Sequence, residues 1–490
     1  MKIAFVASEV FPFAKTGGLA DVSSSLPIEL SKLGVDVKVF MPKYYHIDEE
    51  KHGLHFMWTL GNIPVRVGGK VYEVQIYKSK IPNSNVEIYF IDSPHHFHRQ
   101  NIYTNDKDED ERFILFNKAV IEFIQRIHWK PDLFHCNDWQ TGLIPLLVKD
   151  NYSWDKVFDK TAFLFTIHNV AYQGLFDRSV LEKGEMNPKY FYPMGPVEFY
   201  NSFSFLKAGI VFSEMVNTVS DTYAKELLTP EYSEGMYGVL REKGSSFSGI
   251  LNGVDYELWN PATDNLIPYN YTPDNMGGKL LNKKWFLRQL NMRFDENIPL
   301  IGIIMRLVKQ KGIEILMEAL PGLLQLNVQW VVLGTGEAEY EEQFLKISEE
   351  HYDRFTVRFG FNNQLAHQIE AAADIFLMPS HFEPCGLNQI YSLKYGTVPV
   401  VRKTGGLADT VQDWNEYNAM GLDTGTGFSF SEYSGAALEH TVRRAIGDFY
   451  NKPVWNKIRR NGMLKDYSWR KSAEKYLELY NSAINKRNSQ

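Results

Sequence analysis

The heptapeptide Lys-Thr-Gly-Gly-Leu-Ala-Asp occurs twice in this chain, at residues 15–21 and again at residues 403–409. Each copy follows a short apolar run typical of a β-strand, residues 3–7 or 398–401, and leads into a helical pattern. A glycine pair at such a turn lets the backbone approach a ligand closely, and the free N–H groups of the helix start then face an anion. No periodic array joins the copies, so the chain is not a solenoid. We therefore expect two anion-binding loops, each entered by a lysine, that hold one ligand between two domains.

Composition limits the classes of protein that this chain can belong to. Its 490 residues are 44% hydrophobic and 23% charged, as expected for a globular protein of two or more domains. The formal net charge of −7 argues against a nucleic-acid partner. Only Cys136 and Cys385 are cysteines, which fits a reducing compartment. Glu9 interrupts the first apolar run, and no run reaches the roughly 18 residues that span a bilayer. We expect a soluble cytoplasmic protein without a membrane partner, and its oligomeric state stays open.

Short apolar runs alternate with helical patterns along most of the chain, which predicts βαβ units and parallel sheets. Residues 60–92 differ, because their runs alternate with turns and indicate an antiparallel addition. The predicted fold class is therefore α/β, with two doubly wound parallel-sheet domains facing a central cleft, where ligands bind at the carboxyl ends of the strands. The expected parallel strands are residues 35–40, 132–135, 162–167 and 215–219, and in a later series 300–304, 329–333, 356–359, 375–378 and 398–401.

The domain boundaries follow from breaks in this pattern. Residues 248–255, with a Pro/Asn-rich stretch to about residue 275, form the expected linker. Residues 468–484 have helical apolar spacing, and we expect this helix to return and pack on the first domain. Acidic residues near 106–112 predict a solvated loop and the first turn of a helix. The expected domains are residues 1–255, residues 256–465 and a C-terminal helix in residues 466–490.

Polar residues follow several predicted strands, at the edge where a doubly wound sheet binds its ligand. Any one of them is more often structural than catalytic, and the functional interpretation depends on the whole set. Arg306 and Lys311 suit a diphosphate, because the planar guanidinium of Arg306 can bind two oxygens and the ammonium group of Lys311 adds a compact positive charge. The full set is His135, Asn137, Asp138, Trp139, His168, Asn169, Arg306, Lys309, Lys311, Ser380, His381, Glu383 and Cys385.

Several chemistries find no support in the sequence. Metal-ligand spacings such as CxxC or HExxH are absent, and His95, His96 and His98 are expected to be exposed. No G-x-S-x-G elbow indicates a serine hydrolase. Neither heptapeptide matches the dinucleotide-binding or P-loop patterns, which disfavours a nicotinamide enzyme and a P-loop NTPase.

Six sequence blocks together resemble the bacterial glycogen synthase and plant starch synthase family. These are retaining glycosyltransferases with two Rossmann-like domains, the GT-B architecture. The resemblance covers almost the whole chain and implies transfer of glucose from ADP-glucose to the 4-hydroxyl at the non-reducing end of an α-1,4-glucan. It implies a first domain on the acceptor side and a second that binds the nucleotide sugar. The blocks are residues 9–19, 137–139, 166–174, 249–255, 306–312 and 383–387, the last running into the second heptapeptide.

The resemblance also implies a role for individual residues. Arg306 and Lys311 would hold the diphosphate and stabilise the departing ADP, Lys15 would serve donor binding and catalysis, and His168 and Glu383 would lie beside the transferred glucose. These five are the expected catalytic residues. Substrate-binding positions implied in the same way are Gly18, Thr404, Gly405 and Gly406 at phosphate; Asp21 in the first loop; Tyr103, Asp138 and Asn252 on the sugar and acceptor side; Cys385, Gly386 and Leu387 in the pocket floor; and Gly360 with Phe361 at adenine.

The implied mechanism needs no metal and no cofactor, because fixed cations and helix-start N–H groups supply the positive charge. Glu383 is not expected to be a covalent nucleophile, since the two-carboxylate glycosidase scheme does not transfer to this site. Asn388 and Ser392 depart from common family residues without removing a charged position. Two alternatives stay open: a UDP-glucose-dependent enzyme of the same fold and a non-catalytic glucan-binding homologue. A glucan phosphorylase would need a pyridoxal lysine in a much longer chain.

Overall fold

The computed structural model describes residues 1–489, and they form two compact units. The first unit joins Met1–Gly253 to the segment that starts at Trp469, and the second is Val254–Ser468. The chain therefore passes between the units at residues 253–254 and 468–469. The boundaries expected from the sequence lay after residues 255 and 465, within three residues of these positions.

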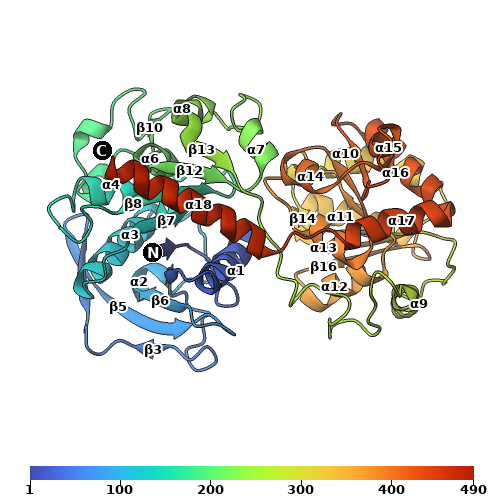
Figure 1. The fold of residues 1–490 in the computed structure, drawn as a ribbon, viewed down its shortest axis with the longest axis horizontal. Helices are drawn as coiled ribbons and strands as arrows, with labels where there is room; N and C mark the ends of the chain where they lie inside the picture. Colours follow the sequence, from blue (N-terminus) through green and yellow to red (C-terminus); the bar gives the residue numbers. More distant parts are fainter. Residues whose placement is uncertain (490) are drawn as a thin grey trace. The chain divides into compact units, whose positions relative to one another are not determined.

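A ten-stranded mixed sheet forms the centre of the first unit, with the order β13-β12-β8-β7-β1-β2-β6-β5-β3 and β4 paired to β5 (Figure 1). The parallel strands expected in the first half are present, and the antiparallel addition is confirmed in β5, which pairs with β3, β4 and β6. The strands are β1 (Lys2–Val6), β2 (Asp36–Pro42), β3 (His55–Phe56), β4 (Ile63–Val67), β5 (Lys70–Lys80), β6 (Glu87–Asp92), β7 (Leu133–Asn137), β8 (Ala162–Ile167), β12 (Met215–Thr218) and β13 (Phe247–Gly249); β9 (Leu175–Phe176), β10 (Glu198–Phe199) and β11 (Ser202–Ser204) make a separate small sheet.

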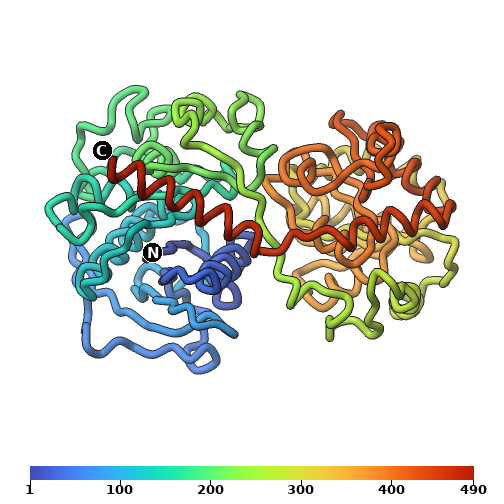
Figure 2. Tube along the Cα trace, viewed as in Figure 1, coloured from blue at the N-terminus to red at the C-terminus, as the bar shows by residue number. Residues whose placement is uncertain are grey.

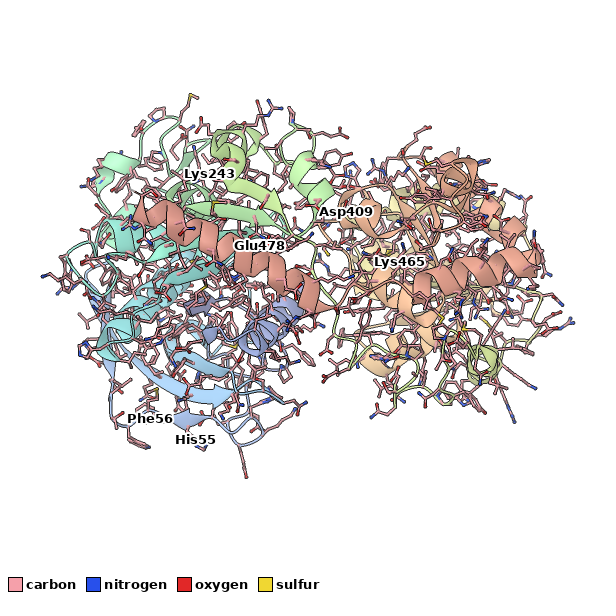
Figure 3. The ribbon with its side chains drawn as sticks, in the orientation of Figure 1. His55, Phe56, Lys243, Asp409, Lys465 and Glu478 are labelled. Atoms are coloured by element: carbon pink, nitrogen blue, oxygen red, sulfur yellow. The ribbon has the colours of Figure 1, made fainter. Side chains whose placement is uncertain are left out.

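Helices cover both faces of this sheet, as right-handed crossovers between parallel strands require. Helices α1 (Gly18–Lys32) and α18 (Trp469–Asn488) pack together, and α3 (Glu109–Arg126), α4 (Ile144–Lys149) and α6 (Phe205–Phe212) form a second group. Lys243, labelled in Figure 3, donates to the carbonyls of Val211 and Ser213 at the end of α6. The remaining helices are short: α2 (Pro94–Phe97), α5 (Val180–Gly184), α7 (Asp221–Glu226) and α8 (Tyr237–Lys243).

The C-terminal helix belongs to the first unit, where it contacts β7, β8 and β12, and Figure 2 shows it in red beside the blue-to-green trace of that unit. A buried polar network fastens it there. His135 on β7 contacts the hydroxyl of Tyr480 at 2.8 Å and that of Thr166 at 2.7 Å, and Thr166 donates to Asn217 at 2.6 Å. Asn217 in turn donates to the hydroxyl of Tyr476 at 3.1 Å. The expected return of this helix to the first unit is therefore confirmed, and His135 has a structural role.

The second unit has a six-stranded parallel sheet with the order β16-β15-β14-β17-β18-β19. Its strands are β14 (Leu300–Leu307), β15 (Gln329–Gly336), β16 (Phe355–Phe359), β17 (Ile375–Met378), β18 (Val398–Arg402) and β19 (Phe428–Phe430). Five of the six were expected, and β19 is a three-residue edge strand with too little periodicity to predict. The helices are α9 (Gly277–Gln289), α10 (Ile313–Leu323), α11 (Ala338–Glu350), α12 (Asn363–Ala372), α13 (Asn388–Tyr395), α14 (Gly405–Thr410), α15 (Trp414–Ala419), α16 (Gly435–Tyr450) and α17 (Lys452–Met463).

The expectation that the Pro/Asn-rich stretch to residue 275 is a linker is wrong. The ring of Trp259 stacks between His367 and Tyr391, with centroids 3.7 and 3.8 Å away. Tyr271 is buried and donates to the carbonyl of Tyr395 at 2.8 Å. Aromatic burial therefore makes this stretch part of the second unit, although its composition resembles that of a loop.

One expectation about exposure in the first unit also needs correction. His96 is fully buried, because its ring packs beside Tyr72 and its Nδ1 contacts Ser93 at 2.8 Å. The acidic stretch agrees with the expectation, because residues 105–107 are exposed and α3 begins with an acidic first turn. Within that turn Glu109 and Asp110 are buried, and their ion pairs with Arg112 and Lys183 make this burial of charge tolerable.

Among the described residues, none of the helices combines the length and the apolar character that crossing a bilayer requires.

Candidate active site

Each of the two large sheets has one point where the chain reverses its direction of winding, and several of the predicted site residues lie at the ends of the strands on either side of it. In the second unit the point lies between the neighbouring strands β14 and β17, and in the first unit between β1 and β7. Loops after these strands are where doubly wound sheets bind ligands. Arg306 lies at the end of β14, and Lys311 follows that strand. Glu383 follows β17, Lys15 follows β1 and Asp138 follows β7.

An ion pair dominates the site of the second unit. Lys311 Nζ donates to Glu383 Oε2 at 2.6 Å, and Ser380 Oγ donates to the same oxygen at 2.9 Å. The Glu383 side chain is only 8% exposed, so this carboxylate is desolvated and depends on both donors. Arg306, at the end of β14, is exposed. The unit therefore offers one exposed cation and one cation already held by a carboxylate.

The two loops that carry this pair interlock through their main chains. The backbone N–H of His381 donates to the carbonyl of Gln310 at 2.8 Å, and the side chain of Gln310 donates to the carbonyl of Phe382 at 3.2 Å. Gly312 has a φ of +74°, and a Cβ there would lie 2.0 Å from the Pro379 carbonyl oxygen. Glycine at this position is thus required for the loop of Lys311 to approach the loop of Glu383.

The second heptapeptide packs directly on the segment that holds Glu383. A Cβ on Gly405 would lie 1.9 Å from the Glu383 carbonyl oxygen, and one on Gly406 would lie 2.0 Å from that of Cys385. The N–H of Gly406 donates to the Glu383 carbonyl at 3.1 Å. The expectation of a free Gly406 N–H aimed at a ligand is therefore wrong, because this glycine pair permits close contact between two backbone segments. Lys403 pairs with Glu416 at 2.6 Å.

The first heptapeptide, although identical in sequence, has different partners. Lys15 Nζ contacts both carboxylate oxygens of Asp21, at 2.7 and 2.8 Å. Gly17 is extended, with φ of −153°, and a Cβ there would have no neighbour within 4 Å. Backbone N–H groups of Thr16 and Gly17 donate to the carboxylate of Glu9. An internal anion therefore binds these two N–H groups, and the expected contact of Gly18 with phosphate stays a prediction.

His168 lies after β8, where Asn137 determines which of its ring nitrogens carries the proton. The Asn137 amide donates to the Val6 carbonyl at 3.0 Å, so its Oδ1 accepts from His168 Nε2 at 2.9 Å. Burial lowers the pKa of His168 to about 3, and the ring is therefore neutral at ordinary pH. With the proton on Nε2, Nδ1 is left as a hydrogen-bond acceptor.

Asp138 supports the same loop in an unusual backbone conformation. Its Oδ1 accepts from the backbone N–H of His168 at 2.7 Å, and its own φ is +57°. Such conformations gather at functional sites, where the surrounding structure enforces them. Burial raises the pKa of Asp138 to about 7, opposed by hydrogen bonds from the backbone of His168 and Asn169 and reinforced by the charge of Glu9.

This shift predicts a pH dependence of stability with a definite sign. Asp138 has a folded pKa of about 7, above its usual value of about 3.9. Between these values the native state holds a proton that the unfolded state has lost, so the contribution of this group to stability falls as pH rises. We expect the stability of the wild type, relative to Asp138→Asn, to decrease between about pH 4 and pH 7. Thermal unfolding of both proteins across this range measures the difference, and a pH-independent difference would contradict the assignment.

The remaining predicted residues take several positions. Tyr103 donates to Glu9 at 2.6 Å, and Phe361 after Gly360 presents 81% of its surface. Asn252 is buried with no hydrogen-bond partner for its Oδ1. Cys385 is buried, Gly386 has a φ of +68°, and Leu387 precedes α13.

Sequence reasoning missed two residues that organise these loops. Arg402 donates to the carbonyls of His381 and Ser431, and nothing in its surroundings along the chain indicated this. Glu9 lies inside a block that the family resemblance used, but no role was assigned to it. The signal that could have indicated a role for Glu9 is its position as a charged residue soon after the buried strand β1. Asn388, which departs from the commoner family residue, donates to the Ile304 carbonyl on β14 at 2.8 Å.

Comparisons with known proteins agree with this architecture. The family model described as "Starch synthase catalytic domain" matches residues 2–242, and "Glycosyl transferases group 1" matches residues 290–461. Glycogen synthase of Thermosipho melanesiensis is 44% identical over 99% of this chain and 100% of its own, and that of Thermotoga maritima is 43% identical over 99% of each.

Solved structures resemble the chain over its full length. The catalytic domain of Starch Synthase IV from Arabidopsis thaliana, bound to ADP and acarbose, matches with a TM-score of 0.92 and 32% identity over 99% of both chains. Sucrose-phosphate synthase from Thermosynechococcus elongatus matches with a TM-score of 0.61 at 16% identity over 99% of both chains, which indicates a shared fold.

Proposed function

The chain belongs to the glycogen and starch synthase family of GT-B glycosyltransferases, and on that premise we propose how its residues perform the transfer. It moves glucose from ADP-glucose to the 4-hydroxyl at the non-reducing end of an α-1,4-glucan, with retention of configuration. The observation that carries the role assignment is the Lys311–Glu383 pair at the reversal point of the second sheet. A cation and a carboxylate held 2.6 Å apart with little exposure suit a site where charge develops on a leaving group.

The second unit is proposed to bind the donor. Arg306 offers a planar fork for the diphosphate, and Lys311 adds a point charge that stabilises the departing ADP. The exposed ring of Phe361 suits stacking on adenine. We propose that the positive charge of Arg306 and Lys311 stabilises the leaving diphosphate, so that the reaction needs no metal and no cofactor.

The first unit is proposed to hold the transferred sugar and the acceptor. His168, neutral and with Nδ1 free to accept, receives a hydrogen bond from a sugar hydroxyl. Asn252 has a buried Oδ1 without a partner, which a hydroxyl of the substrate would satisfy. Lys15 contributes its ammonium group to donor binding and catalysis.

The anomeric configuration is proposed to be retained because the leaving group departs and the acceptor attacks on the same face of the sugar. As the bond between glucose and phosphate breaks, the acceptor hydroxyl attacks from the same side and its proton passes to the leaving phosphate. Glu383 is not the nucleophile in this scheme, because Lys311 and Ser380 both bind its carboxylate and lower its reactivity. Its role is to hold Lys311 and to bind the glucose.

Donor preference tests the proposal against the UDP-glucose alternative. We expect kcat/KM with ADP-glucose to exceed that with UDP-glucose by at least tenfold when incorporation into glycogen is measured. Phe361→Ala should raise the KM for ADP-glucose about tenfold or more, because stacking contributes about 1–3 kcal/mol per base. Tyr352→Ala is the matched control, since Tyr352 is also 80% exposed in the second unit. A higher kcat/KM with UDP-glucose would overturn the assignment of the donor.

The proposed location is the cytoplasm. Both cysteines, Cys136 and Cys385, are free and buried, which fits a reducing compartment.

A further inference from the structure

Glu9 stands at the start of the first heptapeptide loop and is only 3% exposed. Its Oε1 accepts from the hydroxyls of Thr16 and Tyr103, both at 2.6 Å. Its Oε2 accepts from the backbone N–H of Thr16 and, at 3.2 Å, from that of Gly17. Four donors therefore surround one buried carboxylate, and three of them belong to the glycine loop.

No ion pair joins Glu9 to a lysine or arginine in the part of the chain that the structure describes. Lys15, the nearest cation along the loop, donates to Asp21 instead. The negative charge is thus met by two hydroxyls and by the backbone N–H groups of Thr16 and Gly17, which directly precede the first residue of α1. Glu9 therefore binds these loop amides from within the protein.

Tyr103 holds this carboxylate from the opposite side. Burial raises the pKa of Tyr103 well above its usual value, and the charge of Glu9 adds to the shift, so the hydroxyl keeps its proton and donates. The oxygen of the same hydroxyl lies 2.7 Å from Ser8 Oγ, and the Ser8 carbonyl accepts from Tyr44 at 2.9 Å. Tyr103 therefore connects Glu9 to a different loop, residues 98–108.

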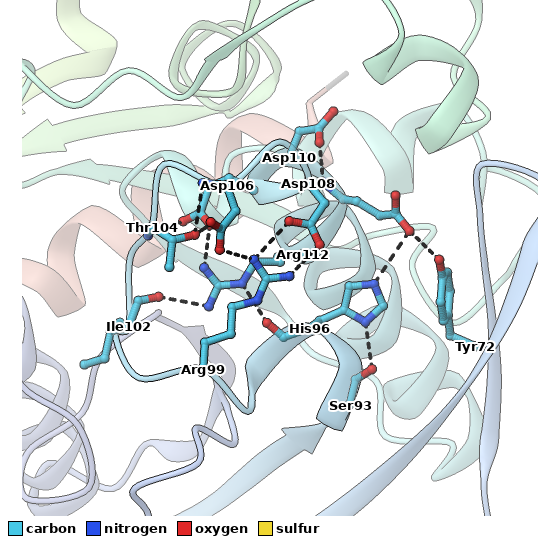
Figure 4. Close-up of polar contacts among 12 residues, drawn as sticks. Tyr72, Ser93, His96, Arg99, Ile102, Thr104, Asp106, Asp108, Asp110 and Arg112 are labelled. Atoms are coloured by element: carbon cyan, nitrogen blue, oxygen red, sulfur yellow. Dashed lines mark hydrogen bonds and ion pairs between the residues drawn. The ribbon is translucent and has the colours of Figure 1, made fainter.

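That loop is itself fixed by two arginines, as Figure 4 shows. Arg112, fully buried on α3, donates to the carbonyls of His96 at 2.7 Å and Ile102 at 3.0 Å, and pairs with Glu109 at 2.5 Å. Arg99 binds Asp106 and Asp108. The position of Tyr103 is consequently determined by the buried Arg112–Glu109 pair and by the partly exposed ion pairs of Arg99.

We propose that Glu9 is a positioning residue: its carboxylate anchors Thr16 and Gly17, and thereby fixes Lys15 for catalysis, while Tyr103 anchors Glu9. The inference rests on the proposed function only in that Lys15 acts on the donor. It follows that the backbone N–H groups of Thr16 and Gly17 do not bind the donor phosphate. The two copies of the heptapeptide are therefore unequal, since the first contributes its lysine ammonium and uses these loop amides internally.

A measurement of the loop itself tests the anchor without any assay of activity. Glu9→Gln keeps the shape of the side chain but replaces one acceptor oxygen with an N–H₂ group that faces donors. We expect hydrogen–deuterium exchange in the peptide that contains Thr16 and Gly17 to become at least tenfold faster in a chain that stays folded, with a melting temperature that is only modestly lowered. Glu111→Gln is the matched control, because Glu111 contacts Tyr72 and His96 and not the loop. Unchanged exchange in Glu9→Gln would overturn the anchor.

Kinetics test whether the anchor acts through Lys15. Glu9→Gln should lower kcat about 10- to 100-fold with little change in the KM for ADP-glucose, and Tyr103→Phe should lower it less. In the Lys15→Ala background, Glu9→Gln should have almost no further effect, because both changes remove the same contribution. An equal loss of kcat in both backgrounds would mean that Glu9 does not act through Lys15, and wild-type kcat in Glu9→Gln would refute the role outright.

The exchange and kinetic experiments together distinguish a failure of this inference from a failure of the proposed function. If the wild type transferred no glucose from ADP-glucose, the proposed function would be wrong while the exchange experiment would still decide the anchor. If the wild type were active and exchange in Glu9→Gln were unchanged, only the role of Glu9 would be wrong.

Discussion

Replacing Lys311 or Glu383 by alanine is expected to lower kcat about 10³-fold, since groups that stabilise charge on a leaving group act mainly in the transition state. Their ion pair at 2.6 Å makes them one functional unit. The double variant should therefore lose little more activity than either single variant, which a double-mutant cycle measures. This result would also exclude a non-catalytic glucan-binding protein, for which neither change would matter to catalysis.

Stability must be followed in the same variants. Lys311→Ala leaves a carboxylate that is 8% exposed with Ser380 as its remaining side-chain donor, and we expect a loss of about 1–3 kcal/mol. Circular dichroism should show a folded chain. Lys309→Ala is the matched control, because Lys309 lies in the same turn but is 76% exposed. Activity of Lys311→Ala near that of the wild type would contradict the role of the pair.

The second large effect is expected at Gly405. A methyl group there would lie 1.9 Å from the carbonyl oxygen of Glu383, and the obstacle is backbone that cannot rotate away. Gly405→Ala should therefore destabilise the second unit by about 3 kcal/mol or more and displace the segment that carries Glu383, so that activity is lost as well.

Gly17→Ala is the control for this change, because Gly17 occupies the first glycine position of the other copy. Its added Cβ would have no neighbour within 4 Å, and its φ of −153° suits any residue. We expect a change in stability within about 1 kcal/mol, measured by thermal unfolding. Equal effects of Gly17→Ala and Gly405→Ala would show that the two loops are packed alike, contrary to the structure.

The sheets were predictable because parallel strands buried on both faces have continuous apolar runs. Residues 300–304 and 375–378 show this pattern, and both lie in strands. Residues 256–275 lie in the expected second domain, but their interpretation as a linker was wrong, because the stacking of Trp259 between His367 and Tyr391 joins residues more than a hundred positions apart. Composition reports only local preferences, so such tertiary contacts are invisible to it.

The heptapeptides show the same limit within the site. Identical residues predict identical loops, yet Gly17 has φ of −153° and Gly405 has φ of +43°. Glycine permits both conformations, and the partner decides between them: Glu9 for the first copy and the 383–385 segment for the second. The family motifs indicated which residues to consider, but Glu9 depends on Tyr103, 94 positions away along the chain, and no local pattern reveals that contact.

The central claim is retaining transfer of glucose from ADP-glucose to the non-reducing end of an α-1,4-glucan. The most direct test is to incubate the protein with ADP-glucose and a short maltooligosaccharide and to examine the anomeric protons of the product by NMR. The account predicts chains lengthened by glucose units joined through new α-1,4 linkages, with the original reducing end unchanged. A β-linked product, growth at the reducing end, or no lengthening at all would contradict it.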